Sequence, residues 1–158
     1  MRRSCCHGLV GVSVALIVGI MVGGAARAQE TIKIGLMLTY SGPFADNARQ
    51  IDNGVQLYIK QHGDSVGGRK IEIIKRDTTG AAPDIAKRLA QELVTRDKVD
   101  FLAGFVLTPN ALAVADVASE AKVPMVIMNA ATSIITAKSP YVARVSFNIG
   151  VVTELRAI

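Results

Sequence analysis

The sequence contains very few of the residues that form redox, metal and histidine-based catalytic sites. Among its 158 residues there are two cysteines, two histidines and no tryptophan. Cys5, Cys6 and His7 are adjacent near the start, so His62 is the only one of these four in the later part of the chain. Neither a disulfide, nor a metal cluster, nor a histidine dyad can be assembled there. We expect His62 to lie on the surface near a helix end.

Motifs of nucleotide-dependent and acyl-transfer enzymes are missing as well. No G-x-G-x-x-G follows the first strand-like run, and Pro43 stands where a dinucleotide fold needs backbone close to the pyrophosphate. Neither G-x-x-x-x-G-K-[ST] nor G-x-S-x-G occurs. Asp77 lies where such a fold places its ribose-binding acid, but without the glycines we interpret it as a turn-forming residue. We therefore expect no enzyme activity and no cofactor.

The excess of basic residues is small once the first 28 residues are set aside. The net charge of the whole chain is +5, but three of its 18 Lys and Arg residues precede residue 29 and no acidic residue does. The later part has 15 basic against 13 acidic residues. A balance this close to neutral predicts no basic surface and no nucleic-acid partner.

Residues 1–28 have the pattern of a secretory signal peptide. Two arginines directly follow the first methionine, and an uncharged apolar run covers residues 9–24. Ala26-Arg27-Ala28 then places small residues at the two positions that a signal peptidase reads. We expect cleavage after Ala28 and a mature protein in the periplasm. The apolar run is shorter than the ~20 residues that span a bilayer comfortably, which disfavours the alternative of a retained anchor.

Strand-like and helix-like segments alternate after the leader. Residues 32–38 form an apolar run of strand length, and a turn containing Gly42 and Pro43 follows. From Asp46 the apolar residues recur at helical spacing, with Asp46 or Asn47 as a candidate cap. The later elements are expected as a strand at 70–76 after a glycine turn, a helix from Pro83 to about Asp97, a strand at 100–104, a helix at 108–121, a strand at 123–127, a short helical turn at 134–137 and an extended segment at 141–147.

This order with short connections predicts an α/β fold, a parallel sheet with helices on both faces. Pro83 and Pro109 suit the first turn of a helix, and Thr108 is a candidate cap. Four loops should then gather at the carboxyl edge of the strands, at 39–46, 77–82, 105–109 and 128–133. They are rich in hydroxyls and small residues, which let a ligand approach backbone N–H groups and helix N-termini. Such an edge suits a carboxylate better than it suits catalysis.

Several motifs in this order resemble the extracytoplasmic solute-binding proteins of ABC transporters, of the leucine/isoleucine/valine-binding (branched-chain amino-acid) type. The resemblance covers residues 31 to about 147 and implies the first lobe of a type I periplasmic-binding-protein fold. Its implied partners are a small-molecule ligand, either an amino acid of the branched-chain type or another small carboxylate, and an ABC permease in the membrane. The matching residues are the signal peptide, Ile32-Lys33-Ile34-Gly35, Ser41-Gly42-Pro43, the glycine turn before Ile71-Glu72, Asp77, and Val123-Pro124 through Asn129-Ala130-Ala131-Thr132.

The resemblance also implies ligand-binding residues. The turn from Ser41 to Phe44 would line the cleft between two lobes. Thr108 falls where the family holds the ligand carboxylate with a hydroxyl, and Ala130 and Thr132 fall where it uses a backbone group and a second hydroxyl. These five residues are the candidate site, and the expected mechanism is capture by closure of the lobes without covalent chemistry. Some relatives place an aromatic ring over the ligand side chain at the position where this chain has Asn47.

The length of the chain departs from the family. A complete member would be roughly twice as long, with two lobes of ordinary domain size. We expect residues 29–147 to form the first lobe and 148–158 the hinge and the start of a second lobe that is otherwise missing. As such an amino-terminal fragment, the chain should bind its ligand weakly or not at all and expose apolar surface that the missing half would cover.

Three functions stay open as alternatives to solute binding for an ABC transporter. They are the ligand-sensing ectodomain of a receptor that shares this fold, a non-functional truncated remnant, and an α/β enzyme with a nucleotide cofactor. The export signal and the missing glycine fingerprint weigh against the enzyme. A longer reading frame with a membrane span and a signalling domain would identify the receptor.

Overall fold

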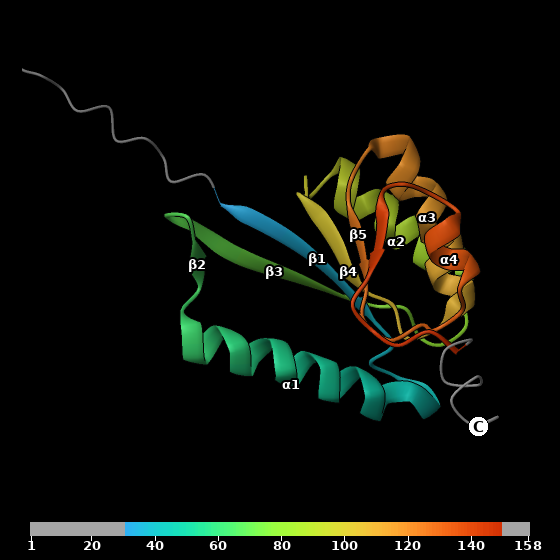
Figure 1. The fold of residues 1–158 in the computed structure, drawn as a ribbon, viewed down its shortest axis with the longest axis horizontal. Helices are drawn as coiled ribbons and strands as arrows, with labels where there is room; N and C mark the ends of the chain where they lie inside the picture. The colour runs from blue at the N-terminus through green and yellow to red at the C-terminus, as the bar shows by residue number, and fades with distance from the viewer. Residues whose placement is uncertain (1–30, 150–158) are drawn as a thin grey trace, which may run out of the picture.

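The computed structural model describes residues 31–149, which form a six-stranded sheet with helices on both faces (Figure 1). The strands are β1 (Ile32–Leu38), β2 (Ser65–Val66), β3 (Arg69–Asp77), β4 (Phe101–Gly104), β5 (Met125–Ile127) and β6 (Val142–Arg144). The helices are the 3₁₀ turn η1 (Gly42–Phe44), α1 (Ala45–His62), α2 (Pro83–Thr95), α3 (Thr108–Ala121) and α4 (Ile134–Ala137).

The first strand lies inside the sheet and sets its register. The strand order is β2-β3-β1-β4-β5-β6, so β1 has a parallel partner on each side. Leu36, Met37 and Leu38 are at most 1% exposed, as expected for an apolar strand covered on both faces. Apart from the short β2, the strands of the described sheet all pair in parallel. This confirms the predicted α/β class and its mainly parallel sheet.

The two faces of the sheet are covered unequally. Met37 points to the face that carries α2 and α3, where Leu93, Leu102 and Val114 are fully buried. The other face receives Leu36 and Leu38 and is covered by α1, of which only Ala48 is buried. Figure 1 shows α1 alone on its side of the sheet, with α2, α3 and α4 grouped on the other. The larger core therefore lies on the α2 and α3 side.

β3 and β4 lie within one residue of their predicted bounds, whereas the structure differs more at β2, β5 and β6. The predicted glycine turn contains β2, which pairs antiparallel with β3, so the sheet is not wholly parallel. β5 begins at Met125 rather than Val123, because the Val123 amide is donated to Ala118 of α3 and Pro124 has no amide. β6 spans 142–144 rather than 141–147, since the short β5 offers it only three residues to pair with.

The predicted helix caps are wrong at two places. A 3₁₀ turn precedes α1, so Phe44 takes the capping position and neither Asp46 nor Asn47 does. The Ala45 amide bonds back to Gly42, which provides through the backbone what a side-chain cap would provide. Thr108 is the first residue of α3 rather than its cap, and no side chain caps that helix. Prolines in the first turns of α2 and α3 are confirmed.

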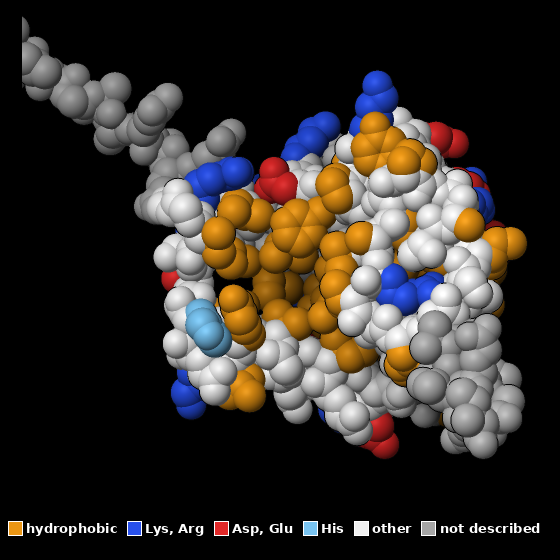
Figure 2. Space-filling model, in the orientation of Figure 1, with side chains coloured by type: hydrophobic (Ala, Val, Ile, Leu, Met, Phe, Trp, Pro, Cys, Tyr) orange, Lys and Arg blue, Asp and Glu red, His pale blue; other side chains and the backbone are white. Residues whose placement is uncertain are grey.

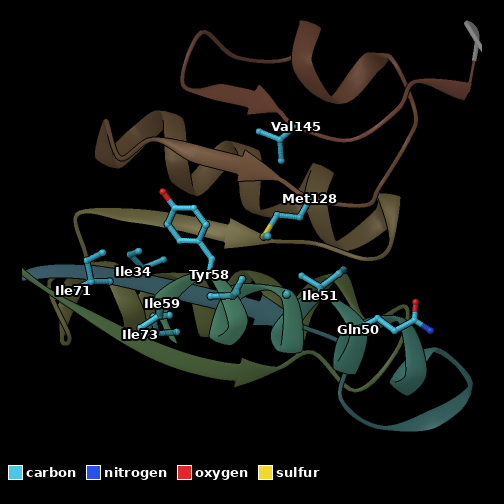
Figure 3. Close-up of a pocket in the computed structure, with 11 residues that line it drawn as sticks. Ile34, Gln50, Ile51, Tyr58, Ile59, Ile71, Ile73, Met128 and Val145 are labelled. Carbon is cyan, nitrogen blue, oxygen red and sulfur yellow. The ribbon is translucent and has the colours of Figure 1, made fainter. Parts of the chain in front are cut away.

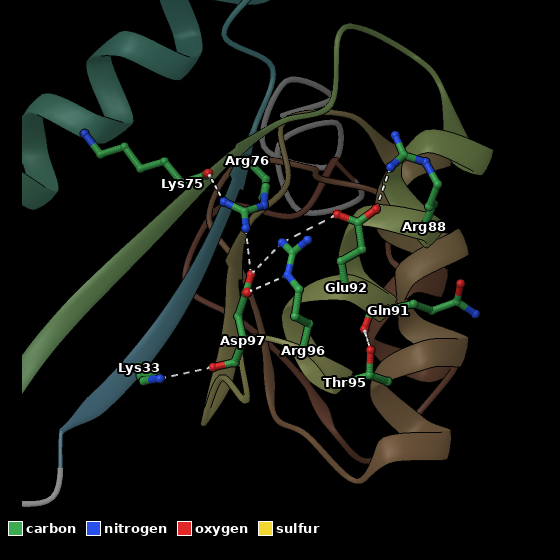
Figure 4. Close-up of polar contacts among 9 residues, drawn as sticks. All are labelled: Lys33, Lys75, Arg76, Arg88, Gln91, Glu92, Thr95, Arg96 and Asp97. Carbon is green, nitrogen blue, oxygen red and sulfur yellow. Dashed lines mark hydrogen bonds and ion pairs between the residues drawn. The ribbon is translucent and has the colours of Figure 1, made fainter.

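Charged side chains tie the end of α2 to the neighbouring strands (Figure 4). Arg76 of β3 donates to the Asp97 carboxylate at 2.6 Å, and the Lys33 ammonium of β1 donates to the Asp97 carbonyl at 3.3 Å. Arg96 donates to the same carboxylate at 2.9 Å. These contacts connect the end of α2 to β1 and β3. The helix itself ends at Thr95 rather than near Asp97 as predicted. Because the charges are paired within the fold, we assign the cluster a structural role.

Some predicted segments lie outside the described residues. They are the signal peptide at 1–28 and, within the predicted hinge at 148–158, everything after residue 149. Between residues 31 and 149, no helix is both long enough and apolar enough to cross a bilayer. His62 is exposed, as predicted, and stacks on the ring of Tyr58 at the end of α1.

Gly104 is required where β4 leads into its loop. Its φ of 114° belongs to the region that favours glycine, and a Cβ there would lie 2.4 Å from the carbonyl oxygen of Met37. The amide of Phe105 donates to the same oxygen at 2.8 Å. The backbones of β1 and β4 therefore approach too closely at this point for any side chain.

We expect Gly104→Ala to lower the free energy of unfolding by about 2–3 kcal/mol, from backbone strain and from the clash with Met37. Urea denaturation measures the change. Gly54→Ala is the control, because a Cβ at Gly54 meets nothing within 4 Å. In the interior of α1, alanine should raise the free energy of unfolding by about 0.5–1 kcal/mol relative to glycine. Equal effects of the two substitutions would contradict this account of Gly104.

Candidate functional site

The four predicted loops lie together at the carboxyl edge of the sheet, where hydrogen bonds connect them. The hydroxyls of Thr39 and Thr78, after β1 and β3, are 3.0 Å apart and buried. The loops after β4 and β5 are joined because the Ala130 amide donates to the Phe105 carbonyl at 2.9 Å. The parallel register thus produces the edge that the sequence predicts.

Thr108 and Thr132 form a hydroxyl pair at this edge. Thr108 begins α3, Thr132 lies between β5 and α4, and their Oγ1 atoms are 2.8 Å apart. Both residues are half-buried. Each hydroxyl has one proton, so a bond between the two uses one and leaves the other to donate to a third group. The positive end of the α3 dipole lies at the same place and favours an anion as that group.

The other predicted site residues have different surroundings. Ala130 is 3% exposed, and its amide already donates to the Phe105 carbonyl. The backbone amide of Ala130 is therefore not available to a ligand in this structure. Ser41 and Phe44 belong to the loop after β1 and are exposed, Phe44 by 39%. Asn47 is exposed in the first turn of α1. The structure therefore brings Thr108, Ala130 and Thr132 together and leaves Ser41 and Phe44 on a neighbouring loop.

Asp77 holds the loop after β1 in place. Its Oδ1 accepts the amide of Tyr40 at 2.9 Å and the amide of Thr79 at 2.8 Å, which makes it the turn-forming residue predicted from the sequence. Burial opposes ionisation of this carboxyl, but hydrogen bonds from Thr79, Ser41 and Tyr40 outweigh it and hold the pKa of Asp77 below its usual range. The ionised carboxylate orders the turn that leads to Ser41.

The Tyr40 hydroxyl stays neutral over the physiological range. Burial, followed by the nearby carboxylates of Asp52 and Asp77, raises the pKa of Tyr40 to about 12. The ring packs on the α1 side of the sheet with Leu36 and Leu38. Tyr40 therefore links the ordered turn to the hydrophobic core below it.

Two residues that order the edge were not predicted from the sequence. Asn110 is 1% exposed, and its side chain donates to the Gly80 carbonyl at 2.7 Å and accepts the Ala82 amide at 3.0 Å, which joins the loop after β3 to α3. A lone polar residue on the apolar face of α3 was the available signal. Arg144, at the end of β6, donates to the Thr132 carbonyl at 2.5 Å. Its signal was a single charge in an extended segment.

An apolar cavity lies away from this edge, between α1 and the neighbouring face of the sheet. Figure 2 shows it as a hollow with hydrophobic walls, and Figure 3 shows the side chains that enclose it. Its volume is about 480 Å³. No charged residue lines it, and Thr108 and Thr132 are not part of it, so it does not suit a carboxylate. It is lined by Ile34, Gln50, Ile51, Gly54, Val55, Tyr58, Ile59, Ile71, Ile73, Met128 and Val145.

Residues 31–149 contain no group of three or more His, Cys, Asp or Glu side chains that could hold a metal ion. The described edge offers hydroxyls, backbone groups and a helix N-terminus instead. Groups of this kind can hold an anion through hydrogen bonds.

We expect Asp77→Asn to lower the free energy of unfolding at pH 7 by about 1 kcal/mol, because charge-assisted hydrogen bonds to a partly exposed carboxylate are lost. The pKa of Asp77 is lower in the folded state, so its contribution is present above the unfolded pKa near 4 and is lost as the pH falls through the folded value. Urea denaturation at pH 7 and at pH 2–3 should therefore show a difference only at pH 7.

Asp46→Asn is the matched control, since Asp46 pairs with Arg49 on an exposed turn of α1 and should contribute less than about 0.5 kcal/mol. A difference between wild type and Asp77→Asn that persists undiminished at low pH would contradict the assigned role of the carboxylate.

Comparison with known proteins gives the family. Residues 31–151 match the periplasmic binding protein family. The Leu/Ile/Val-binding protein homolog 6 of Brucella abortus is 45% identical over 133 residues, which are 84% of this chain and 34% of that protein.

Two solved structures match the fold. A solute-binding protein of an ABC transporter from Rhodopseudomonas palustris BisB5, in complex with 3,4-dihydroxybenzoic acid, is 54% identical with a TM-score of 0.73 over 75% of this chain and 32% of that one. The branched-chain amino-acid binding protein LivJ of Streptococcus pneumoniae, in complex with isoleucine, is 26% identical with a TM-score of 0.69 over 75% of this chain and 34% of that one.

This chain spans about a third of the length of these relatives. Residues 31–151, which match the family model, include the whole described sheet. The chain belongs to the periplasmic binding protein family, and residues 31–149 have the fold of the first lobe of a type I member.

Proposed function

We propose that the chain is the first lobe of the substrate-binding component of an ABC transporter, which captures a small carboxylate in the periplasm for uptake by a membrane permease. The observation that supports it most is the Thr108 and Thr132 hydroxyl pair, 2.8 Å apart beside the amino terminus of α3. It offers an anion an O–H donor and a helix dipole in one place. Capture of a solute by these groups needs no covalent step.

Aromatic carboxylates are the ligand class that we favour over branched-chain amino acids. The relative bound to 3,4-dihydroxybenzoic acid is 54% identical to this chain, whereas the relative bound to isoleucine is 26% identical. Both kinds of ligand carry a carboxylate, which the hydroxyl pair would hold in either case. An amino-acid ligand also carries an amino group, which needs a hydrogen-bond acceptor or an acidic residue in the site. An aromatic acid has no such group and makes no such demand.

We propose the same division of the chain as the sequence predicts. Residues 1–28 are an export signal, 29–147 form the lobe, and 148–158 lead toward a second lobe in a longer protein. In such a protein, other parts of the chain would cover the cavity between α1 and the sheet, which accounts for the apolar side chains that line it. The export signal directs the lobe to the compartment in which its relatives of this family work.

Thermal unfolding with added ligands tests the ligand class. The 158-residue chain is expressed with its own leader and purified from the periplasm, and its new amino terminus should be Gln29. One lobe supplies only part of the contacts that lobe closure would complete, so the isolated chain should bind weakly. We expect millimolar 4-hydroxybenzoate or 3,4-dihydroxybenzoate to raise Tm slightly and leucine or isoleucine to leave it unchanged. A ligand at its Kd stabilises the folded state by about 0.4 kcal/mol. A shift with isoleucine alone would overturn the aromatic class, and no shift with any carboxylate would contradict the site.

Thr108→Val should weaken 4-hydroxybenzoate binding about tenfold, because the isosteric side chain removes one hydroxyl of the pair and with it an O–H donor to the ligand. Isothermal titration measures the change. Thr95→Val is the control, since the Thr95 hydroxyl bonds within α2 to the Gln91 carbonyl at 2.6 Å, away from the edge (Figure 4). Equal losses in both variants would place the ligand elsewhere.

The open apolar face should make the isolated chain bind hydrophobic dyes and self-associate. Val145 lines the cavity and is 71% exposed, so Val145→Lys should reduce both effects while changing the free energy of unfolding by less than about 0.5 kcal/mol. Dye fluorescence and sedimentation measure them. Gln56→Lys, on the exposed part of α1 and outside the cavity, is the control. A wild-type chain that is monomeric and binds no dye would contradict this prediction.

A further inference from the structure

Arg144 reaches back from β6 to the loop that carries Ala130 and Thr132. Its Nη2 donates to the Thr132 carbonyl at 2.5 Å, and its Nη1 donates to the Ala131 carbonyl at 3.3 Å. The Ala131 carbonyl also accepts the amide of Ile149 at 3.0 Å. Two carbonyls of the loop are thus held by one guanidinium, whose planar fork fixes their relative orientation.

No carboxylate of residues 31–149 pairs with this cation within 4 Å. Lys138 provides the contrast, because it binds the Leu112 carbonyl at 2.9 Å but also pairs with Asp116 at 2.9 Å. Arg144 is half-buried, and its Nε is a buried donor without an acceptor in the described part of the chain. A half-buried cation with a spare donor is stabilised when an anion comes close.

The groups around Arg144 indicate where such an anion would bind. Thr132, whose carbonyl the guanidinium holds, presents its hydroxyl to Thr108 at the amino terminus of α3. The cation, the hydroxyl pair and the helix dipole therefore act on one small region at the end of β5 and β6. Groups fixed before the ligand arrives are the ones that contribute most to electrostatic stabilisation.

We propose that Arg144 is a positioning residue for carboxylate binding: it fixes the 130–132 loop through two carbonyls and supplies the positive charge that makes the site prefer an anion to a neutral ligand. The second part of this inference rests on the proposed function, and the first part does not. A purely structural Arg144 would affect acids and neutral ligands equally.

The test compares two probes that differ in charge, 4-hydroxybenzoate and 4-hydroxybenzamide, on the full chain. We expect Arg144→Met to weaken binding of the acid about tenfold and of the amide less than about threefold. Arg144→Lys should recover part of the acid affinity, because it restores the charge but not the fork. Lys138→Met is the matched control and should leave both affinities within about twofold, since its cation already has a carboxylate partner.

Amide hydrogen exchange gives a readout that needs no ligand. Arg144→Met should speed exchange of the Ala130 amide about tenfold, and Lys138→Met should not. Unchanged exchange in Arg144→Met overturns the positioning role, and equal losses for acid and amide overturn the electrostatic role. If the wild type binds neither probe, the carboxylate function fails and the electrostatic role fails with it, while the exchange result alone decides the positioning role.

Discussion

The parallel pairing of β1, β3, β4, β5 and β6 is the constraint on which the rest of this lobe depends. Because the strands run the same way and pair in register, their carboxyl ends meet at one edge, and every loop that leads into a helix begins there. The close approach at Gly104 keeps β1 and β4 in that register. Hydroxyls that are far apart in the sequence, such as those of Thr108 and Thr132, become neighbours as a result.

The edge and the open face of the sheet have opposite chemistry and different roles. Several polar contacts order the edge around a region suited to an anion: Thr39 bonds to Thr78, Asn110 donates to the Gly80 carbonyl, and Asp77 accepts the Tyr40 amide. The face beside α1 is apolar over a cavity of about 480 Å³. The edge therefore carries the groups that the proposed carboxylate site needs, whereas the apolar face is suited to burial against protein.

Sequence patterns predicted the elements well where local chemistry dominates. The strand at 32–38 has its predicted bounds and α3 ends at Ala121 as predicted, since an uninterrupted apolar run and a helical repeat define them locally. Elements that depend on a partner were predicted less well. β6 is short because β5 is short, and β2 forms only because β3 lies next to it.

In the candidate site too, features set by the local sequence could be predicted and features that depend on distant partners could not. Its loops could be predicted because strand ends define them, and Thr108 and Thr132 were chosen through the family resemblance. The bond between their hydroxyls could not be predicted, because a side-chain pattern does not show which of two functions, capping or pairing, a threonine serves. Asn110 and Arg144 act on backbone carbonyls of distant loops, and no local pattern marks such contacts.

Residue-resolved NMR titration of the ¹⁵N-labelled chain with 4-hydroxybenzoate tests the central claim most directly, because it locates the ligand. The account predicts saturable amide shifts concentrated at residues 105–109 and 128–133, with Thr108 and Thr132 among the largest. Shifts confined to the cavity lining on α1, around Val55 and Tyr58, would contradict it, as would a spectrum that no carboxylate changes.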